Sequence, residues 1–447
     1  MLIRFVTSNF LSFNEEKEFN MLAGSFRTHK HHVYKAGKLN VLKGAAIYGA
    51  NGAGKSNLVK AIDYLKQMVE NGGLEKSVNS QKFKLDKTKA NVPVEFEIEF
   101  YYKRKIYAYG VSVNGNVVEK EWLYISGIDK EDKLVFERKT LKSGKSNVKL
   151  GKSYIKTKKD ELLIELMEDN LLLSDELLIG KTENLNIVDI ENVREWMRGC
   201  LWIIYPYDKK IELLLKGIGL HPQLMQSSNE LIKTFDIGIS ELLVKKISFN
   251  GYFGSEDDKL VSKLIDLIEQ RGHAIFYDND GNSLLAVKEN DTYMVKKMMS
   301  RHASDLDKMI EFDLAEESDG TRRLMEFIPV VGAVLEDNLT CIIDEIDQSL
   351  HPELLQTLVK KIMDEPNTKG QLIFTTHESN LLDLNIFRQD EIWFAEKDKG
   401  GATNLYSLSE FKPRYDLDIR KGYLKGRFGA VPFTADLKKL NWQEIHA

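Results

Sequence analysis

The chain has 447 residues, of which 43% are hydrophobic and 29% charged, and its formal net charge is -5. This length allows two or three domains, the acidic balance excludes a general attraction to nucleic acid, and only two cysteines exclude a disulfide framework. No apolar run reaches the ~18 residues of a membrane span and the N-terminus lacks a signal-peptide pattern, so we expect a cytoplasmic protein without a membrane partner.

The first part of the chain predicts short strands, a glycine-rich loop and a helix. Residues 2–5 and 10–13 look like short strands, and residues 39–42 and 45–48 form two further apolar runs. The loop follows at 49–56, after which apolar residues recur at helical spacing. The order strand, loop, helix is the context in which such a loop binds phosphate.

The middle of the chain has a different pattern. Residues 93–126 alternate and contain the tight-turn pair Asn114-Gly115, so they predict antiparallel strands. Residues 157–245 are predicted to be mostly helical, and 246–300 are mixed. The basic stretch 138–159 has nine Lys/Arg and no acid. We interpret it as a solvated hairpin tip, with a contact to nucleic-acid phosphates as the alternative.

After residue 318 the alternation of strands and helices returns. Residues 339–343 and 371–374 are apolar runs expected of strands buried on both faces, with a helix at 352–363 between them. The prediction is an α/β head that is split by an insertion. Its parts are 1–155 with the antiparallel β section, 156–312 as an inserted mostly helical or mixed domain, and 313–447.

The glycine-rich loop fits the pattern G-x-x-x-x-G-K-[ST] at every position. Its glycines let backbone N–H groups converge on phosphate oxygens, and the following helix adds its positive end. Lys55 can reach the β- and γ-phosphates of ATP, and Ser56 can ligate Mg²⁺. The residues predicted to bind the nucleotide here are Gly49, Asn51, Gly52, Ala53, Gly54, Lys55, Ser56 and Asn57.

Chemically active side chains follow the two buried strands. Asp344 fits a group that holds Mg²⁺, and Glu345 beside it fits a base that polarises the attacking water. His377 can hydrogen-bond a γ-phosphate or that water. The sequence therefore predicts an ATPase whose catalytic residues are Lys55, Glu345 and His377, with Ser56 and Asp344 on the metal.

Ser318 and Gly320 precede a further helical run. A serine and a glycine at a helix N-terminus make an end that can bind an anion, but by itself this segment is an N-cap, as most such segments are.

Together these segments resemble the ATPase head of the ATP-binding cassette (ABC) class, in the branch with the SMC and RecF proteins. Residues 49–56 are similar to Walker A, 318–321 to the signature motif, 342–345 to Walker B, 347–352 to the D-loop, and His377 to the switch histidine. Gln81 is a candidate for the Q-loop glutamine of that class. The signature departs from Leu-Ser-Gly-Gly-Gln at Glu317, Asp319 and Thr321.

The resemblance implies an assembly. Such heads bind two ATP molecules between two subunits, so Ser318 and Gly320 of one subunit would contact the nucleotide of the other, and Ser318 would cap the γ-phosphate held by Lys55. We therefore expect a head-to-tail homodimer or a higher homo-oligomer.

A closer resemblance is to bacterial AAA-family ATPases that include RloA and AbiLi-like phage-resistance proteins. It covers nearly the whole chain, including the tail segments 390–397, 405–408 and 422–432. It implies a sensor or regulator in an anti-phage defence system that controls a separate effector, a nuclease or a toxin. About 70 residues follow His377, too few for a nuclease domain within this chain.

Two alternatives remain open. A DNA-repair or chromosome-maintenance ATPase that binds DNA is favoured by the basic stretch, whereas the absence of a long coiled-coil pattern and the family-specific tail favour the defence role. A scaffold that binds ATP with slow or no turnover is suggested by the altered signature.

Five other residues are interpreted as structural. His29, His31 and His32 are interpreted as a solvated loop near the nucleotide rather than a metal site. Phe10 and Phe13 are interpreted as core residues rather than a stacking surface for adenine.

Overall fold

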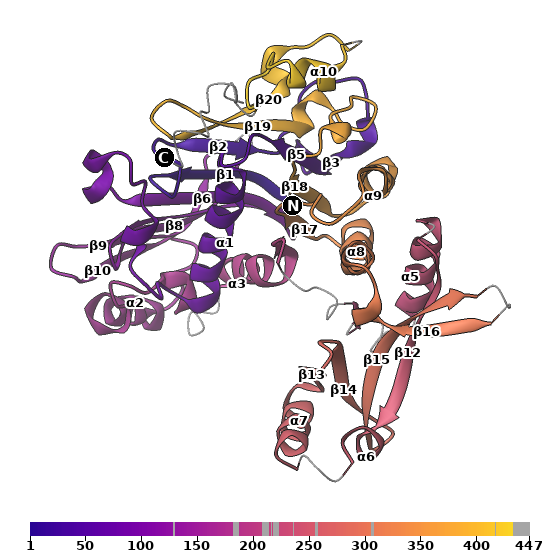
Figure 1. Cartoon of the computed structure of the whole chain (residues 1–447). Coiled ribbons are helices and arrows are strands. Elements are labelled where there is room, and N and C mark those ends of the chain that lie inside the picture. Colours follow the sequence, from indigo (N-terminus) through magenta and orange to yellow (C-terminus); the bar gives the residue numbers. More distant parts are fainter. Residues whose placement is uncertain are drawn as a thin grey trace, which may run out of the picture. The chain divides into compact units, whose positions relative to one another are not determined.

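The computed structural model divides into two compact units (Figure 1). The first consists of Met1–Pro206, Val334–Ile346 and Leu358–Ala447, and the second of Tyr207–Ala333 and Asp347–Thr357. The structure describes residues 1–127, 130–181, 187–207, 214, 215, 217, 223–235, 237–254, 258–304, 308–415 and 417–431. Among these residues, no helix has the length and apolar character that crossing a membrane requires.

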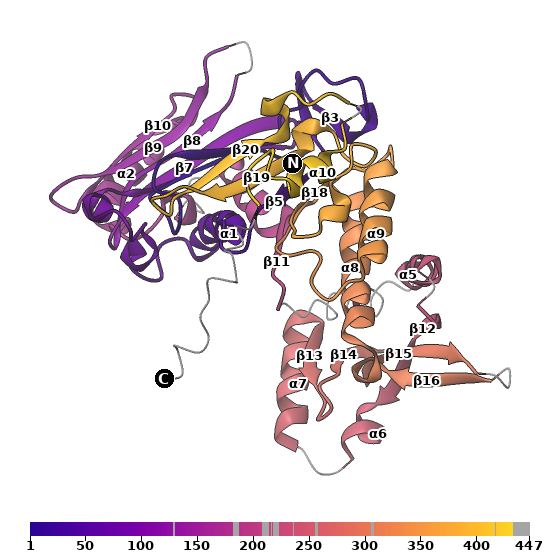
Figure 2. The ribbon, with the colours of Figure 1, turned by 45° about the horizontal axis from the view of Figure 1, so that its top comes forward.

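A six-stranded sheet forms the centre of the first unit. Its order is β11 (Leu201–Ile204), β17 (Thr340–Ile343), β18 (Gln371–Thr375), β5 (Gly44–Tyr48), β19 (Ile392–Lys397) and β20 (Thr403–Ser407). The first five strands are parallel, and β20 pairs antiparallel with β19 (Figure 2). Every residue of β17, β18 and β5 is buried, as their apolar runs predict, because a parallel sheet is covered on both faces.

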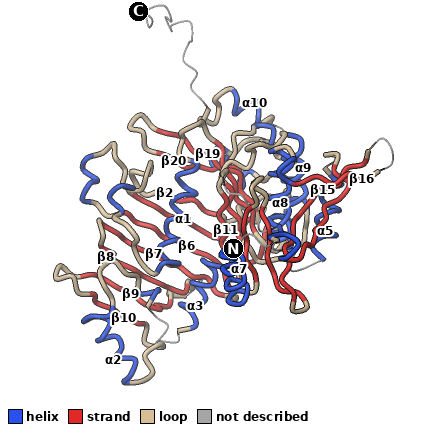
Figure 3. The backbone as a smooth tube through the Cα atoms, turned by 60° about the horizontal axis from the view of Figure 1, so that its bottom comes forward, coloured by secondary structure: helices blue, strands red, loops and turns tan. Residues whose placement is uncertain are grey.

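The first unit also contains a seven-stranded antiparallel sheet (Figure 3). Its order is β10 (Ser146–Leu150), β9 (Lys133–Thr140), β8 (Val117–Ile125), β7 (Lys105–Asn114), β6 (Val94–Tyr102), β1 (Leu2–Ser8) and β2 (Lys17–Asn20). Buried and half-buried residues alternate along most of β6, as its sequence predicts. A short hairpin, β3 (Val33–Ala36) and β4 (Leu39–Leu42), lies outside both sheets. These sheets confirm the predicted α/β head with an antiparallel section.

Helix α1 (Lys55–Asn71) joins the two sheets in one core. Phe10 packs against Tyr64 of α1 and Phe96 of β6, with ring centroids 5.3 and 5.0 Å away. Phe10 and Phe13 are both buried, which confirms them as core residues. The other helices placed mainly in this unit are α2 (Lys158–Leu166), α3 (Val188–Glu195), α9 (Pro352–Asp364) and α10 (Ile419–Leu424). Short 3₁₀ turns lie at Lys30–His32, Val78–Gln81, Lys87–Asn91, Leu178–Gly180, Ser379–Leu381, Gln389–Glu391 and Leu408–Phe411, and π turns at Met167–Leu171 and Trp196–Cys200.

The division between units differs from the predicted one at both boundaries. Residues 313–333 and Asp347–Thr357 belong to the second unit, whereas the sequence places them in the C-terminal part of the head. The described residues of 156–206 belong to the first unit, whereas the sequence places them in the insertion. The reason is long-range packing, since β11 pairs with β17 and the Trp196 ring stacks on Phe100 with centroids 4.0 Å apart. Neither contact has a local sequence signal.

The second unit contains a five-stranded sheet. Its strands are β12 (Ile239–Ser248), β15 (Thr292–Ala303), β14 (Ser283–Glu289) and β13 (His273–Tyr277), with β16 (Met309–Asp313) paired to β15. Its helices are α5 (Gln223–Thr234), α6 (Phe249–Phe253), α7 (Asp258–Arg271), the turn Leu314–Glu316 and α8 (Asp319–Glu336). Residues 239–245, expected to be helical, form β12 instead. Ile239 and Leu242 are buried three positions apart, a helical spacing, but pairing with β15 decides the structure.

Candidate nucleotide-binding site

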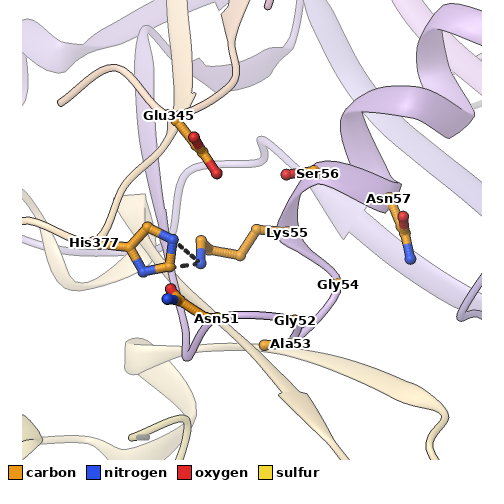
Figure 4. A pocket seen from close by; sticks show the side chains of 9 residues that line it. All are labelled: Asn51, Gly52, Ala53, Gly54, Lys55, Ser56, Asn57, Glu345 and His377. Atoms are coloured by element: carbon orange, nitrogen blue, oxygen red, sulfur yellow. Dashed lines mark hydrogen bonds between the residues drawn. The ribbon is translucent and has the colours of Figure 1, made fainter. Parts of the chain in front are cut away.

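A pocket of about 360 Å³ lies where the glycine-rich loop meets two other segments of the first unit. Strands β5, β18 and β17 are neighbours and parallel, so the residues that follow their carboxyl ends meet at one edge of the sheet. Figure 4 shows Lys55, Glu345 and His377 around this pocket. Its lining residues are Asn51, Gly52, Ala53, Gly54, Lys55, Ser56, Asn57, Glu345 and His377, which includes every predicted loop residue except Gly49.

Two glycines are needed for the loop to pass close to its neighbours. A Cβ on Gly49 would lie 2.4 Å from the carbonyl oxygen of Ala395 in β19. Gly54 has a φ of 107°, and a Cβ there would lie 2.1 Å from Thr403 Oγ1. The loop therefore rests on β19 and β20, and α1 begins immediately after Gly54 with its N-terminus at the pocket.

Lys55 is buried and its ammonium group lies at the mouth of the loop. Nζ donates hydrogen bonds to the carbonyl oxygens of Gly49 at 2.8 Å and Ala50 at 3.3 Å, and it lies 3.0 Å from His377 Nε2. A cation and an imidazole thus share one wall of the pocket. These contacts can be exchanged for phosphate oxygens, because an ammonium group bonds an anion more strongly than a carbonyl.

Ser56 and Asp344 place oxygen ligands at the floor of the site. Ser56 Oγ donates to Asp344 Oδ1 at 3.0 Å, and Thr375 Oγ1 donates to the same oxygen at 2.6 Å. Asp344 is buried, so its carboxylate is satisfied by these hydroxyls. A hydroxyl and a carboxylate from two elements are the hard oxygen donors that Mg²⁺ prefers, so the donor set fits this ion.

Glu345 has a left-handed backbone conformation, with a φ of 50°. A glutamate in this region is strained by ~1–3 kcal/mol and needs support from its surroundings. Thr375 supplies it, because its Oγ1 accepts a hydrogen bond from the Glu345 N–H at 2.8 Å. Thr375 therefore connects Glu345 to Asp344.

Ser12 and Thr403 support the loop but carry no motif in the sequence. Thr403 Oγ1 lies 2.8 Å from the carbonyl oxygen of Ala53 and 2.7 Å from Ser12 Oγ. The amide of Asn57 donates to Ser12 Oγ at 2.7 Å, so this predicted nucleotide ligand is held by a protein contact. Sequence analysis missed both residues because Ser12 lies in the turn after β1 and Thr403 in β20, and both reach the loop only in the folded chain.

Comparison with known proteins gives the family. The family model described as "AAA domain, putative AbiEii toxin, Type IV TA system" matches residues 45–170 and 202–383. The chain belongs to this family. The matched residues include the glycine-rich loop and the segments that carry Asp344, Glu345 and His377.

A curated relative is the Retron Vc95 probable ATPase of Vibrio cholerae serotype O1 biovar El Tor. It is 30% identical over 145 residues, which are 32% of this chain and 27% of that protein. The match thus spans about a quarter of the relative's length.

Solved SMC head domains are also similar. An SmcHead bound to the C-winged helix domain of ScpA is 14% identical with a TM-score of 0.45, covering 92% of this chain and 99% of that one. An SMC head domain from Thermotoga maritima is 10% identical with a TM-score of 0.37, covering 91% and 98%. Because both TM-scores are below 0.5, the fold is defined by the strand order of its sheets.

Ser318 and Gly320 do not line the pocket. Ser318 Oγ accepts a hydrogen bond from the Thr321 N–H at 3.1 Å, so Ser318 caps α8. A Cβ on Gly320 would lie 2.8 Å from the carbonyl oxygen of Ser349, in the D-loop-like segment. Gln81 is also absent from the lining, and its carbonyl oxygen accepts a hydrogen bond from the Leu11 N–H at 2.6 Å.

Residues 138–150 of the basic stretch lie in β9, β10 and the exposed turn between them, the predicted hairpin tip, and the rest form the loop after β10 and the start of α2. Arg138 is not part of the solvated surface, because it is buried and donates to the carbonyl oxygens of Glu176 and Leu173 at 2.8 and 2.9 Å. The prediction of a solvated loop at His29, His31 and His32 is wrong. His32 is buried, since the chain there packs against the segment that leads into β19.

Proposed function

We propose that this chain binds ATP with Mg²⁺ in the pocket and hydrolyses the γ-phosphate, as the regulatory subunit of an anti-phage defence system. The observation that carries the proposal is the meeting of Lys55, the Ser56–Asp344 pair, Glu345 and His377 around one pocket. They come from three segments that follow the carboxyl ends of neighbouring parallel strands, where α/β proteins commonly bind ligands.

The residues of the pocket have separate roles in ATP binding and hydrolysis. The loop N–H groups and Lys55 would bind the β- and γ-phosphates, and Ser56 and Asp344 would hold Mg²⁺, which would supply positive charge beside the phosphate oxygens. Glu345 accepts a hydrogen bond from the attacking water, and His377 donates to the γ-phosphate or orients that water.

We propose that the site is completed by a second copy of the chain. Ser318 is exposed at the start of α8, a helix of 18 residues whose N-terminus attracts anions. In a head-to-tail dimer, Ser318 and Gly320 of one subunit would face the γ-phosphate bound by the other. ATP would then promote dimerisation, and hydrolysis would release it.

A defence role is supported by the relatives. The family's description includes a putative toxin of a type IV toxin–antitoxin system, and a curated relative is a retron ATPase. The ATP-driven change between monomer and dimer would hold or release a separate nuclease or toxin. This part of the proposal predicts that phage resistance in the native host requires an intact ATPase site.

The test compares wild type, Glu345→Gln and Lys55→Ala. Wild type should release phosphate, and Glu345→Gln should bind ATP but release phosphate about 10²–10⁴-fold more slowly, since the general base is lost. Light scattering should find an ATP-stabilised dimer for Glu345→Gln and none for Lys55→Ala. Phosphate release by wild type no faster than by Lys55→Ala would overturn hydrolysis, and a monomeric Glu345→Gln with bound ATP would overturn the dimer.

A further inference from the structure

Three imidazole rings gather in the connection between β2 and β3. His31 and His32 lie in the 3₁₀ turn Lys30–His32, and His29 precedes it with a left-handed φ of 46° that turns its side chain back onto the others. The ring centroids lie 4.5 Å apart for His31 and His32, 4.7 Å for His29 and His32, and 6.0 Å for His29 and His31. One ligand nitrogen from each ring lies within 4.8 Å of the other two.

Each ring offers a nitrogen that can act as an electron-pair donor. His32 Nδ1 lies 3.0 Å from both carboxylate oxygens of Glu391, so Nδ1 donates a proton and Nε2 is left as the acceptor. His29 Nε2 lies 2.9 Å from the carbonyl oxygen of Leu384, which accepts only, so Nδ1 of His29 is the acceptor. His31 Nε2 is buried, and neither it nor His32 Nε2 has a hydrogen-bond partner.

The arrangement is costly for a site without a ligand. Buried polar atoms in native proteins nearly always have a partner, and here two imidazole nitrogens on neighbouring residues lack one. A carboxylate or a carbonyl behind a histidine is also the support that metal-binding histidines use, since it fixes the tautomer and the orientation of the ring. Glu391 supports His32 in this way, and the Leu384 carbonyl supports His29.

We propose that His29 Nδ1, His31 Nε2 and His32 Nε2 bind one Zn²⁺ ion, with water in the fourth position. Imidazole nitrogen is a preferred zinc ligand, and three rings bound tetrahedrally at ~2.05 Å would have centroids about 5 Å apart. The observed separations, 4.5–6.0 Å, bracket that value. The nearby Arg388 guanidinium does not oppose the ion with a free charge, because it is paired with Asp390 at 2.8 Å.

The position of this zinc site gives it a structural role. It fastens the β2–β3 connection to the segment 384–391, which leads directly into β19. Strand β19 pairs with β5, and its Ala395 carbonyl lies against Gly49 of the glycine-rich loop. Zn²⁺ bound here would hold in place the strand on which that loop rests.

The experiment uses the full chain without a histidine tag, stripped with a chelator and titrated with Co²⁺. Tetrahedral Co²⁺ has visible absorption bands, so wild type should develop them at one ion per chain and lose them when Zn²⁺ is added. His31→Ala should bind Co²⁺ at least ~100-fold more weakly, because even a lost supporting contact costs 10–100-fold. Metal analysis after dialysis against Zn²⁺ should give one ion per wild-type chain.

The matched control is His302→Ala. His302 Nε2 lies 2.7 Å from a carboxylate oxygen of Glu317, so it has the same kind of partner as His32 but belongs to no three-histidine cluster. This variant should bind Co²⁺ like wild type. Zn²⁺ should raise the melting temperature of wild type and His302→Ala but not of folded His31→Ala. Equal Co²⁺ affinity in wild type and His31→Ala, or no Co²⁺ absorption in wild type, would overturn the proposal.

Discussion

The nucleotide pocket and the segment around Ser318 are built in different ways. In the pocket, contacts join residues far apart in sequence, as between Ser56 and Asp344 or Lys55 and His377. Ser318 instead uses its hydroxyl within its own turn, on Thr321. The pocket is organised by the parallel sheet of the first unit, whereas the exposed Ser318 is held by contacts within the first turn of α8.

The largest expected effect comes from removing the pocket's cation. Lys55→Ala should lower kcat/KM for ATP by about 10³-fold or more, because a charge-assisted contact to the phosphates is lost at both binding and reaction. Lys60→Ala is the control, since Lys60 lies exposed on the same helix α1. Phosphate release and ATP titration measure both variants. Equal loss in both would mean that the effect comes from α1 and not from the pocket.

The next effect tests whether Ser318 acts in a neighbouring subunit. Ser318→Arg should abolish ATP-promoted dimerisation and lower phosphate release by ~10²-fold, while ATP binding by the monomer stays as in wild type. Light scattering measures dimerisation, and equilibrium binding measures the ATP affinity of the monomer. If Ser318→Arg also lost monomer affinity, Ser318 would serve the pocket of its own chain.

Mixing inactive variants makes this test sharper. In a head-to-tail dimer, Lys55→Ala combined with Ser318→Arg rebuilds one intact site, which uses Lys55 of one chain and Ser318 of the other. Because neither variant dimerises with ATP on its own, the dimers in an equal mixture would be heterodimers with one intact site of two, so up to about half of wild-type phosphate release should return if the sites act independently. A mixture as inactive as its parts would contradict either the shared site or the independence of the two sites. ATP-stabilised heterodimers in the same mixture decide between them.

The sequence predicted the parts of the site that have local patterns. The loop at 49–56, the buried strands before Asp344 and His377, and the cap at Ser318 are each specified within a few residues. Thr403 was not predictable, because its contact with Ala53 spans 350 positions and appears only when β20 pairs with β19. The burial of His32 was missed for the same reason, since its partner Glu391 lies 359 positions away.

A smaller effect concerns the strained glutamate. The free energy of unfolding of Glu345→Gly should be about 1 kcal/mol higher than that of Glu345→Ala. The reason is that glycine adopts a φ of 50° without the clash that any Cβ produces there. Both variants should lose phosphate release, since both lack the carboxylate. Chemical denaturation of the two variants measures the difference. Equal stability would mean that the backbone at 345 relaxes once the carboxylate is gone.

The contact of Thr403 with the glycine-rich loop should contribute a similar amount to stability. Thr403→Val removes the hydroxyl beside the Ala53 carbonyl and leaves that buried oxygen unpaired, which should cost ~1–3 kcal/mol of stability and weaken ATP binding by about 5–10-fold. Thr7→Val is the matched control, because Thr7 is also a buried strand residue but its hydroxyl has no hydrogen-bond partner. Thr7→Val should leave the free energy of unfolding and the free energy of ATP binding within ~0.5 kcal/mol of wild type. Similar losses in both variants would exclude a specific role for Thr403.

The smallest expected effect is at the basic stretch 138–159, where the alternative of DNA binding can be tested. Lys142 in the β9–β10 turn and Lys152 and Lys156 in the loop after β10 are exposed, whereas Arg138 donates hydrogen bonds to backbone carbonyls inside the protein. If the stretch is only solvated, changing the three lysines to Glu leaves DNA affinity, its salt dependence and any DNA-stimulated phosphate release unchanged. If the stretch contacts phosphates, each lost lysine should lower the slope of log affinity against log salt by about 0.9. A reduced slope with unchanged basal phosphate release would favour the DNA-binding ATPase, because the pocket is intact and only the electrostatic contact is lost.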